Sequence, residues 1–226
     1  SGNNGYGIYI SNGLGGGERN AVLGNYIGVD AAGSAALPNT WNGVYVSGTA
    51  NVIGAAGAGN VIGGHGDYGV RIEGATDTIV QGNYIGTNAA GTSAIGNANG
   101  VGVTFGATGT IIGSGVSGEG NVISGNIGSG VYISAGISTI VQGNLIGTAA
   151  DGTTPLGNHS YGLLVDGTNN TIGGTVDGEG NVIANNDSYG VYVTTGSSDN
   201  AILRNSIYDN LSQGIALATD GITPND

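Results

Sequence analysis

The sequence contains no cysteine, no methionine and no lysine, and these absences exclude several classes of protein. Without cysteine there can be no disulfide, no thiolate metal site and no cysteine nucleophile. The only basic side chains are Arg19, Arg71 and Arg204, which against 15 carboxylates leave a net charge of −12. A surface this acidic repels nucleic-acid phosphates and anionic lipid headgroups. No apolar run reaches the roughly 18 residues that cross a bilayer. We therefore expect neither nucleic-acid binding nor membrane insertion.

Proline and charged residues are also scarce, at three residues and 8%, whereas glycine occurs 50 times. The glycines follow no triplet period, which excludes collagen, and they disfavour a helical fold. Apolar residues make up 38% of the chain and are mostly Val, Ile, Leu and Ala, so the chain is expected to fold. This composition, low in charged residues, rich in Gly and Asn and acidic in balance, favours an extracellular or cell-surface location.

A short phrase, Asn followed by a variable residue and then an aliphatic residue (Ile in every copy), recurs along the whole chain. Its asparagines are Asn25, Asn60, Asn83, Asn121, Asn144, Asn181 and Asn205, at gaps of 35, 23, 38, 23, 37 and 24 residues. A second phrase, Gly-apolar-x-apolar, occurs as "GIYI", "GVYV", "GVRI", "GVGV", "GVYI", "GLLV", "GVYV" and "GIAL". A third apolar piece, such as "NVIG" or "TIVQ", stands between them. The order is therefore strand a, strand b, strand c, repeated.

Strand a returns every 24 to 36 residues, counted between the first glycines of its phrase, and strands b and c follow it each time. This pattern predicts an all-β solenoid with three faces. We expect one parallel β-helix domain over residues 1–226, with about seven to eight rungs stacked at about 4.8 Å. The alternating gaps predict two kinds of rung, which pair into a unit of about 60 residues with like loops on every second rung. Inward rows should include Val44 and Val46 on face a, Ile62 and Ile85 on face c, and Ile53, Ile79, Ile112, Ile140, Ile172 and Ile202 on face b.

The seven repeated asparagines are interpreted as an architectural device. Asn tolerates positive φ at a sharp turn, and amides stacked at one corner can hydrogen-bond to each other and to the turn backbone. We therefore predict a structural Asn ladder, not a catalytic row.

The phrases "GNVI", "GNYIGT", "AAGT", "GVYI" and the closing "GIALATDGITPND" resemble repeats of large bacterial secreted or surface proteins. The fold that this resemblance implies is the right-handed parallel β-helix of the pectate-lyase-like superfamily. It covers essentially the whole chain. Well-known members of that superfamily are polysaccharide lyases and hydrolases, so an enzyme of that kind is an alternative function.

The sequence offers no convincing catalytic cluster and no cofactor-binding motif. Arg71 and Glu73 are interpreted as a surface pair, and His65 and His159 stand in loops without partner ligands. The acidic loops "GEGN" and "DGEGN" supply Glu119, Asp177 and Glu179, which are the candidates for Ca²⁺, an ion that prefers oxygen ligands. Together with Asp166 in "VDG" they are also the candidates for a glycosidase. We expect no required cofactor, with Ca²⁺ as the one ion that these loops could bind.

Tyrosines gather on or just before strand a. Tyr9, Tyr45, Tyr132 and Tyr192 should point outward, where a polar-tipped ring suits a neutral glycan or a protein partner.

The open strand edges of a parallel stack suggest head-to-tail association with further copies. The leading interpretation is a non-catalytic stalk, adhesin segment or filament building block. A polysaccharide hydrolase or lyase and a glycan-binding module are the alternatives.

Overall fold

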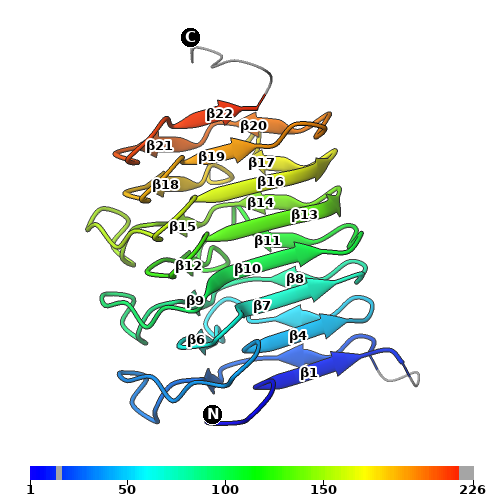
Figure 1. Ribbon diagram of the computed structural model, residues 1–226, viewed down its shortest axis with the longest axis vertical. Helices are drawn as coiled ribbons and strands as arrows, with labels where there is room; N and C mark the ends of the chain where they lie inside the picture. The colour runs from blue at the N-terminus through cyan, green and yellow to red at the C-terminus, as the bar shows by residue number, and fades with distance from the viewer. Residues whose placement is uncertain (14–16, 219–226) are drawn as a thin grey trace.

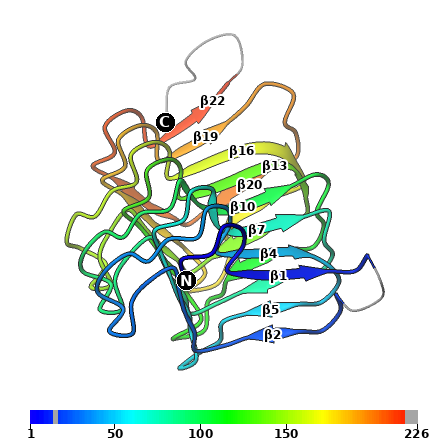
Figure 2. The ribbon, with the colours of Figure 1, turned by 60° about the horizontal axis from the view of Figure 1, so that its bottom comes forward.

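The chain forms a right-handed parallel β-helix, seen side-on in Figure 1 and tilted towards one end in Figure 2. The computed structural model describes residues 1–13 and 17–218, and these contain 22 short strands in three parallel sheets. The last part of the closing phrase, residues 219–226, lies outside the described residues. Each turn of the chain adds one strand to each sheet, as the repeat predicts.

Sheet A corresponds to face a and has eight strands: β1 (Ile8–Ser11), β4 (Val44–Ser47), β7 (Tyr68–Glu73), β10 (Asn99–Thr104), β13 (Val131–Ile137), β16 (Leu163–Thr168), β19 (Val191–Val193) and β22 (Ile215–Leu217). Sheet B corresponds to face b and has seven: β2 (Ala21–Val22), β5 (Val52–Ile53), β8 (Ile79–Val80), β11 (Ile111–Gly113), β14 (Ile140–Gln142), β17 (Thr171–Gly173) and β20 (Ala201–Leu203). Sheet C corresponds to face c and has seven: β3 (Tyr26–Ile27), β6 (Val61–Ile62), β9 (Tyr84–Ile85), β12 (Val122–Ile123), β15 (Leu145–Ile146), β18 (Val182–Ala184) and β21 (Ser206–Tyr208).

Aliphatic side chains from all three sheets fill the centre of the coil in continuous rows. The predicted rows on faces a and c are confirmed; Val44, Val46, Ile62 and Ile85 are fully buried. Two members of the predicted face-b row are wrong, because Ile79 and Ile140 point outward while Val80 and Val141 are buried. Both strands lie in the phrase "TIVQ", in which Ile and Val are adjacent and either could face inward. Pairing with the neighbouring strands fixes the register and turns Val inward.

The predicted Asn ladder lies at the corner between sheets B and C. In each step the Oδ1 of one asparagine accepts the backbone N–H and the Nδ2 group of the asparagine one rung earlier, as at Asn83 and Asn121 (3.0 and 2.9 Å). The same pattern runs from Asn25 to Asn205. The proposed reason of positive φ is wrong, since none of these asparagines adopts it. The residue before the asparagine does so instead in several rungs, for example Gly82 and Arg204.

Amides also stack at the other two corners, which the repeat phrases alone did not predict. Between sheets C and A the ladder contains Asn3, Asn39, His65, Asn97, Asn126, Asn158, Asn186 and Asn210. Between sheets A and B, Asn51, Asn170 and Asn200 occupy the corner together with the buried residues Thr78, Thr110 and Thr139. A signal was available for the first of these, because six of its asparagines stand four residues before the glycine of strand a.

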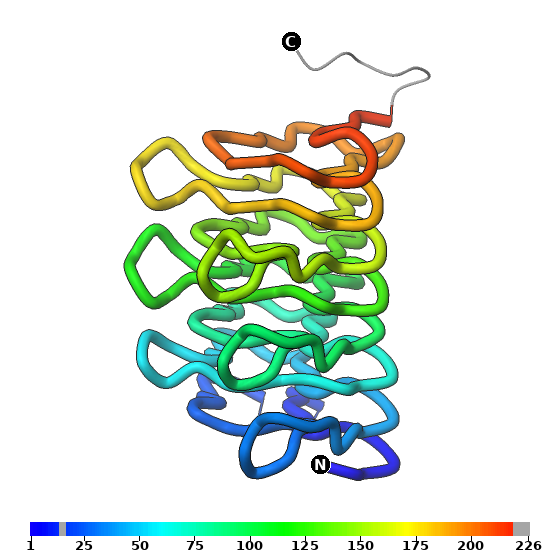
Figure 3. The backbone as a smooth tube through the Cα atoms, turned by 90° about the vertical axis from the view of Figure 1, so that its left-hand side faces the viewer, coloured from blue at the N-terminus to red at the C-terminus, as the bar shows by residue number. Residues whose placement is uncertain are grey.

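The long loops form two columns along the coil, each with one loop on every second rung (Figure 3). The loops after sheet C are hairpins closed by the antiparallel pairs Val29–Ala36, Thr87–Ala94 and Thr148–Pro155. Successive hairpins contact each other directly, because Ala89 N–H donates to Gly33 O and Ala150 N–H to Gly91 O (both 2.9 Å). The loops between sheets B and C form the other column, so the predicted two-rung alternation is confirmed.

Candidate functional surface

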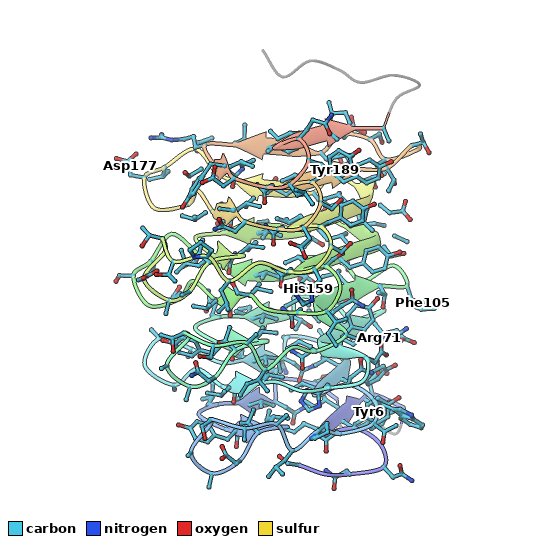
Figure 4. The ribbon with its side chains drawn as sticks, turned by 60° about the vertical axis from the view of Figure 1, so that its left-hand side comes forward. Tyr6, Arg71, Phe105, His159, Asp177 and Tyr189 are labelled. Atoms are coloured by element: carbon cyan, nitrogen blue, oxygen red, sulfur yellow. The ribbon has the colours of Figure 1, made fainter. Side chains whose placement is uncertain are left out.

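The outer face of sheet A carries most of the aromatic side chains. The strand register places one outward residue of each rung in a single column: Tyr9, Tyr45, Arg71, Gly102, Tyr132, Leu164, Tyr192 and Ala216. All four predicted ligand-binding tyrosines therefore lie in this column. Tyr9 is the most exposed of them, at 57%, and the other three are half-buried. Tyr6, Arg71, Phe105 and Tyr189 follow this side of the coil in Figure 4.

Ring contacts divide these aromatic residues into two clusters. The N-terminal cluster contains Tyr6, Tyr9, Trp41 and Tyr45, and the C-terminal cluster contains Tyr161, Tyr189 and Tyr192. Tyr9 and Tyr45 are nearly parallel, at 11°, with their centroids 4.9 Å apart, about one rung spacing. Their faces are therefore turned towards each other, and their edges and hydroxyls are turned outward. This arrangement suits hydrogen bonding along the face better than stacking of a ligand on the rings.

Arg71 is the centre of a polar and aromatic group between the two clusters. Its guanidinium contacts Glu73 (2.9 Å) and also Asp67 (3.4 Å), a partner that the sequence did not predict. The rings of Tyr68 and Phe105 lie 5.6 and 5.7 Å from its Cζ atom. Burial, and next the charge of Asp67, raise the pKa of the Tyr68 hydroxyl. Arg71 therefore forms a surface ion pair with Glu73 and Asp67, and its guanidinium packs against two aromatic rings.

The three acidic residues proposed for Ca²⁺ lie in the loops between sheets B and C. Glu119 accepts hydrogen bonds from Ser114 Oγ (2.6 Å) and Gln81 Nε2 (3.2 Å). Glu179 accepts one from the backbone N–H of Val176 in its own loop (2.9 Å).

Asp177 contacts Arg204 (2.5 Å), and Arg204 also donates to the carbonyl of Thr175 (2.7 Å). In Figure 4, Asp177 lies on the side of the coil away from Phe105. Glu179 lies against Gly115 of the preceding loop, so the structure brings the Glu119 and Glu179 loops together.

A groove of 830 Å³ runs over sheet C beside these loops. Glycines form much of its lining, with Tyr84, Val122 and Leu145 from the outer face of sheet C and Val116 from a loop. Within the described part of the chain, no charged residue lines it. The polar side chains among these lining residues are amides, serine hydroxyls and the Tyr84 hydroxyl, with no carboxylate or histidine.

The two histidines have different environments. His65 is 1% exposed and replaces an amide in the ladder between sheets C and A. Its Nδ1 accepts the backbone N–H of Asn39 (3.3 Å), so the neutral ring carries its proton on Nε2, which donates to the carbonyl of Ile27 (3.2 Å). Burial is the main reason that the pKa of His65 falls to about 4. His159 is exposed on the surface of the coil.

A comparison with protein families places the chain among known β-helix proteins. The model of the family described as "Periplasmic copper-binding protein (NosD)" matches residues 1–221. No curated protein and no solved structure matched the chain. Within the described part of the chain, no helix has the length and apolarity needed to cross a membrane.

The donor groups of this chain do not fit copper. Copper sites in proteins draw on Cys, Met and His side chains, and this chain has no Cys, no Met and two His. Both ring nitrogens of His65 are engaged in ladder hydrogen bonds, and the ring is buried. Among residues 1–13 and 17–218, no group of three or more His, Asp or Glu side chains is placed to share a metal ion. The metal chemistry in the family's description is thus not matched by the donor groups of this chain. Its fold and its sequence over residues 1–221 do match, and the chain belongs to the NosD family of right-handed parallel β-helix proteins.

Proposed function

We propose that this chain is a non-catalytic β-helix scaffold that acts outside the cytoplasm as a stalk, an adhesin segment or a filament building block. The family's description as periplasmic supports a location beyond the inner membrane. The main observation behind the scaffold role is the continuity of the Asn ladder between sheets B and C. The corner between sheets B and C has the same amide pair at every step from Asn25 to Asn205. A rung adapted for catalysis is expected to interrupt such a pattern.

Head-to-tail association with further copies is part of this proposal, because the ladders have a direction. At each step the donors belong to the earlier rung and the Oδ1 acceptor to the later one. The two ends of a ladder are therefore chemically complementary. Parallel strands at the ends of the coil can extend in the same way, through backbone hydrogen bonds.

Sedimentation velocity and electron microscopy at rising protein concentration test this association. Lengthening particles are expected, and Asn25→Lys should prevent them by placing a charge at the first ladder position. Ala31→Lys is the matched control, since Ala31 is exposed on the hairpin loop between Val29 and Ala36 and is not a ladder residue. Strictly monomeric particles at all concentrations would remove the filament form of the proposal, and equal effects of both variants would remove the role of the ladder.

Neutral glycan binding on the outer face of sheet A is the second candidate function. The observation that favours it is the column that contains Tyr9, Tyr45, Tyr132 and Tyr192, whose hydroxyl edges can hydrogen-bond to sugar hydroxyls along the coil. A glycan array probed with the wild type and with the double variant Tyr132→Ala, Tyr192→Ala tests the idea. Unchanged binding by the double variant would contradict it.

A polysaccharide hydrolase or lyase and Ca²⁺ binding at Glu119, Asp177 and Glu179 are separate proposals with direct tests. Release of reducing ends or unsaturated products from a polysaccharide panel would support the enzyme. Calorimetric titration with Ca²⁺, with Glu119→Gln and Glu179→Gln as variants, would test the ion site. A saturable heat lost in both variants is the result that supports it.

A further inference from the structure

The turn after β10 contains one residue more than the turns of the neighbouring rungs. Glu73 pairs with Thr104, and Thr76 pairs with Thr108. Two residues, 74–75, therefore lie between the paired positions in one rung, and three residues, 105–107, lie between them in the next. The following rung again has two, because Ser134 pairs with Thr104 and Ile137 with Thr108. Alignment of "GAT" at 74–76 with "GAT" at 106–108 identifies Phe105 as the additional residue.

Phe105 has a backbone and an exposure that are unusual for its type. Its φ is 55°, a left-handed conformation that a bulky residue rarely adopts, and its side chain is 71% exposed. The Arg71 guanidinium lies 5.7 Å from the ring centroid and supports one side of the ring. Ile137 of the next rung is also exposed, at 41%. The insertion therefore places an aromatic side chain outside the coil, in solvent, against the Arg71 guanidinium.

Carboxylates surround this apolar point. Glu73 occupies the rung before it, and Asp166 lies in the same column on the second rung after it, about 14 Å from Glu73 at three rung spacings. Asp77 lies directly beneath Thr108, to which its backbone N–H donates (2.9 Å). The nearest cation, Arg71, is paired with Asp67 and Glu73. With Asp77 and Asp166 this group has four carboxylates against one guanidinium, a formal net charge of −3. We name Phe105, Ile137, Glu73, Asp77 and Asp166 the Phe105 surface.

We propose that the Phe105 surface docks a basic protein segment, one with an apolar side chain flanked by Lys or Arg. Exposed aromatic residues supply much of the energy at protein interfaces, and an aromatic ring also attracts cationic side chains. The surrounding carboxylates complement Lys and Arg, and the net charge of −12 on a chain without lysine steers basic partners towards it. This proposal concerns a partner, and it stands whether or not the chain forms filaments.

A fluorescence anisotropy titration with short labelled peptides tests the proposal. The probe is an eight-residue peptide in which four lysines surround two leucines, and its counterpart carries glutamate in place of lysine. Phe105→Gly should weaken binding of the basic peptide at least tenfold. It should not impair folding, because glycine accepts the positive φ, and a thermal unfolding curve checks this. Val116→Ser is the matched control, since Val116 is 62% exposed on a loop over another face.

A charge comparison separates docking from general attraction. The triple variant Glu73→Gln, Asp77→Asn, Asp166→Asn should weaken binding and flatten its salt dependence. The control Glu18→Gln, Asp187→Asn, Asp209→Asn removes three exposed charges elsewhere and should have a small effect. Equal effects of the two triple variants, no effect of Phe105→Gly, or no binding of the basic peptide would each overturn the proposal. Binding of a neutral oligosaccharide that depends on Phe105, without peptide binding, would reassign the surface to glycan.

Discussion

The replacement of His65 by asparagine should change how the stability of the coil depends on pH. His65 places an imidazole in a ladder otherwise made of amides. Burial keeps this ring neutral, with its Nδ1 accepting the N–H of Asn39 and its Nε2 donating to the carbonyl of Ile27. Protonation of Nδ1 would place a charge in the interior and remove the acceptor of the Asn39 N–H. Burial accordingly lowers the pKa of the ring from 6.5 to about 4. An amide at this position has no such transition.

The sign and size of the effect follow from proton linkage. Between pH 6.5 and 4 the unfolded chain binds a proton at His65 that the folded chain does not, so the free energy of unfolding falls as the pH falls through this range. The difference between 6.5 and about 4, at about 1.36 kcal/mol per pH unit, corresponds to about 3 kcal/mol. The full contribution is present above pH 6.5, and most of it is lost at pH 4.

Urea unfolding at pH 7.5 and pH 4 measures this contribution, with circular dichroism for the whole coil and Trp41 fluorescence for the neighbouring rung. We expect His65→Asn to be within about 1 kcal/mol of the wild type at pH 7.5 and about 3 kcal/mol more stable than it at pH 4. Titration of the carboxylates affects both proteins and cancels in the comparison. His159→Asn, which alters an exposed histidine outside the ladder, should follow the wild type. Parallel pH profiles for the wild type and His65→Asn would refute the reasoning.

Three further predictions concern the ladder, the face of sheet A and copper. Asn121→Ala should lower the free energy of unfolding by about 3 to 5 kcal/mol, because it leaves the buried donors of Asn83 and the carbonyl of Val80 unpaired. Asn25→Ala, at an exposed step, should lower it by less than about 1 kcal/mol, and urea unfolding midpoints compare the two variants. Gly102→Ala should cost about 1 to 3 kcal/mol, because its Cβ would lie 2.6 Å from the ring of Tyr68, whereas Gly5→Ala meets no atom within 4 Å and should be neutral in a thermal melt. Titration with Cu²⁺ against a competing chelator should reveal no stoichiometric site, and a 1:1 complex that resists the chelator would show that the donor groups of this chain do hold copper.

The repeat phrases were sufficient to predict the solenoid, because each rung repeats the same pattern of short apolar strands and turn residues. The aliphatic rows on faces a and c and the ladder from Asn25 to Asn205 could be read directly, since period-2 alternation and recurring Gly-Asn pairs do not depend on distant contacts. Where the alternation is lost, as in "TIVQ", the sequence placed Ile79 inward and the structure placed Val80 there. Pairing with Val52 and Ile53 of the preceding rung settles that register.

The candidate surfaces depended more heavily on tertiary structure. The sequence by itself determined the coil, its three faces, its two alternating loop types and its lack of Cys and Met ligands for copper, because these follow from composition and from a short-range repeat. Only the stacked rungs decided that His65 completes an amide ladder and that Asp67 joins Arg71. They also decided that the insertion of Phe105 leaves an aromatic ring in solvent among carboxylates. These features arise between residues of different rungs, whose alignment is fixed when inward rows and corner amides pack together, and that alignment is not written in any single repeat.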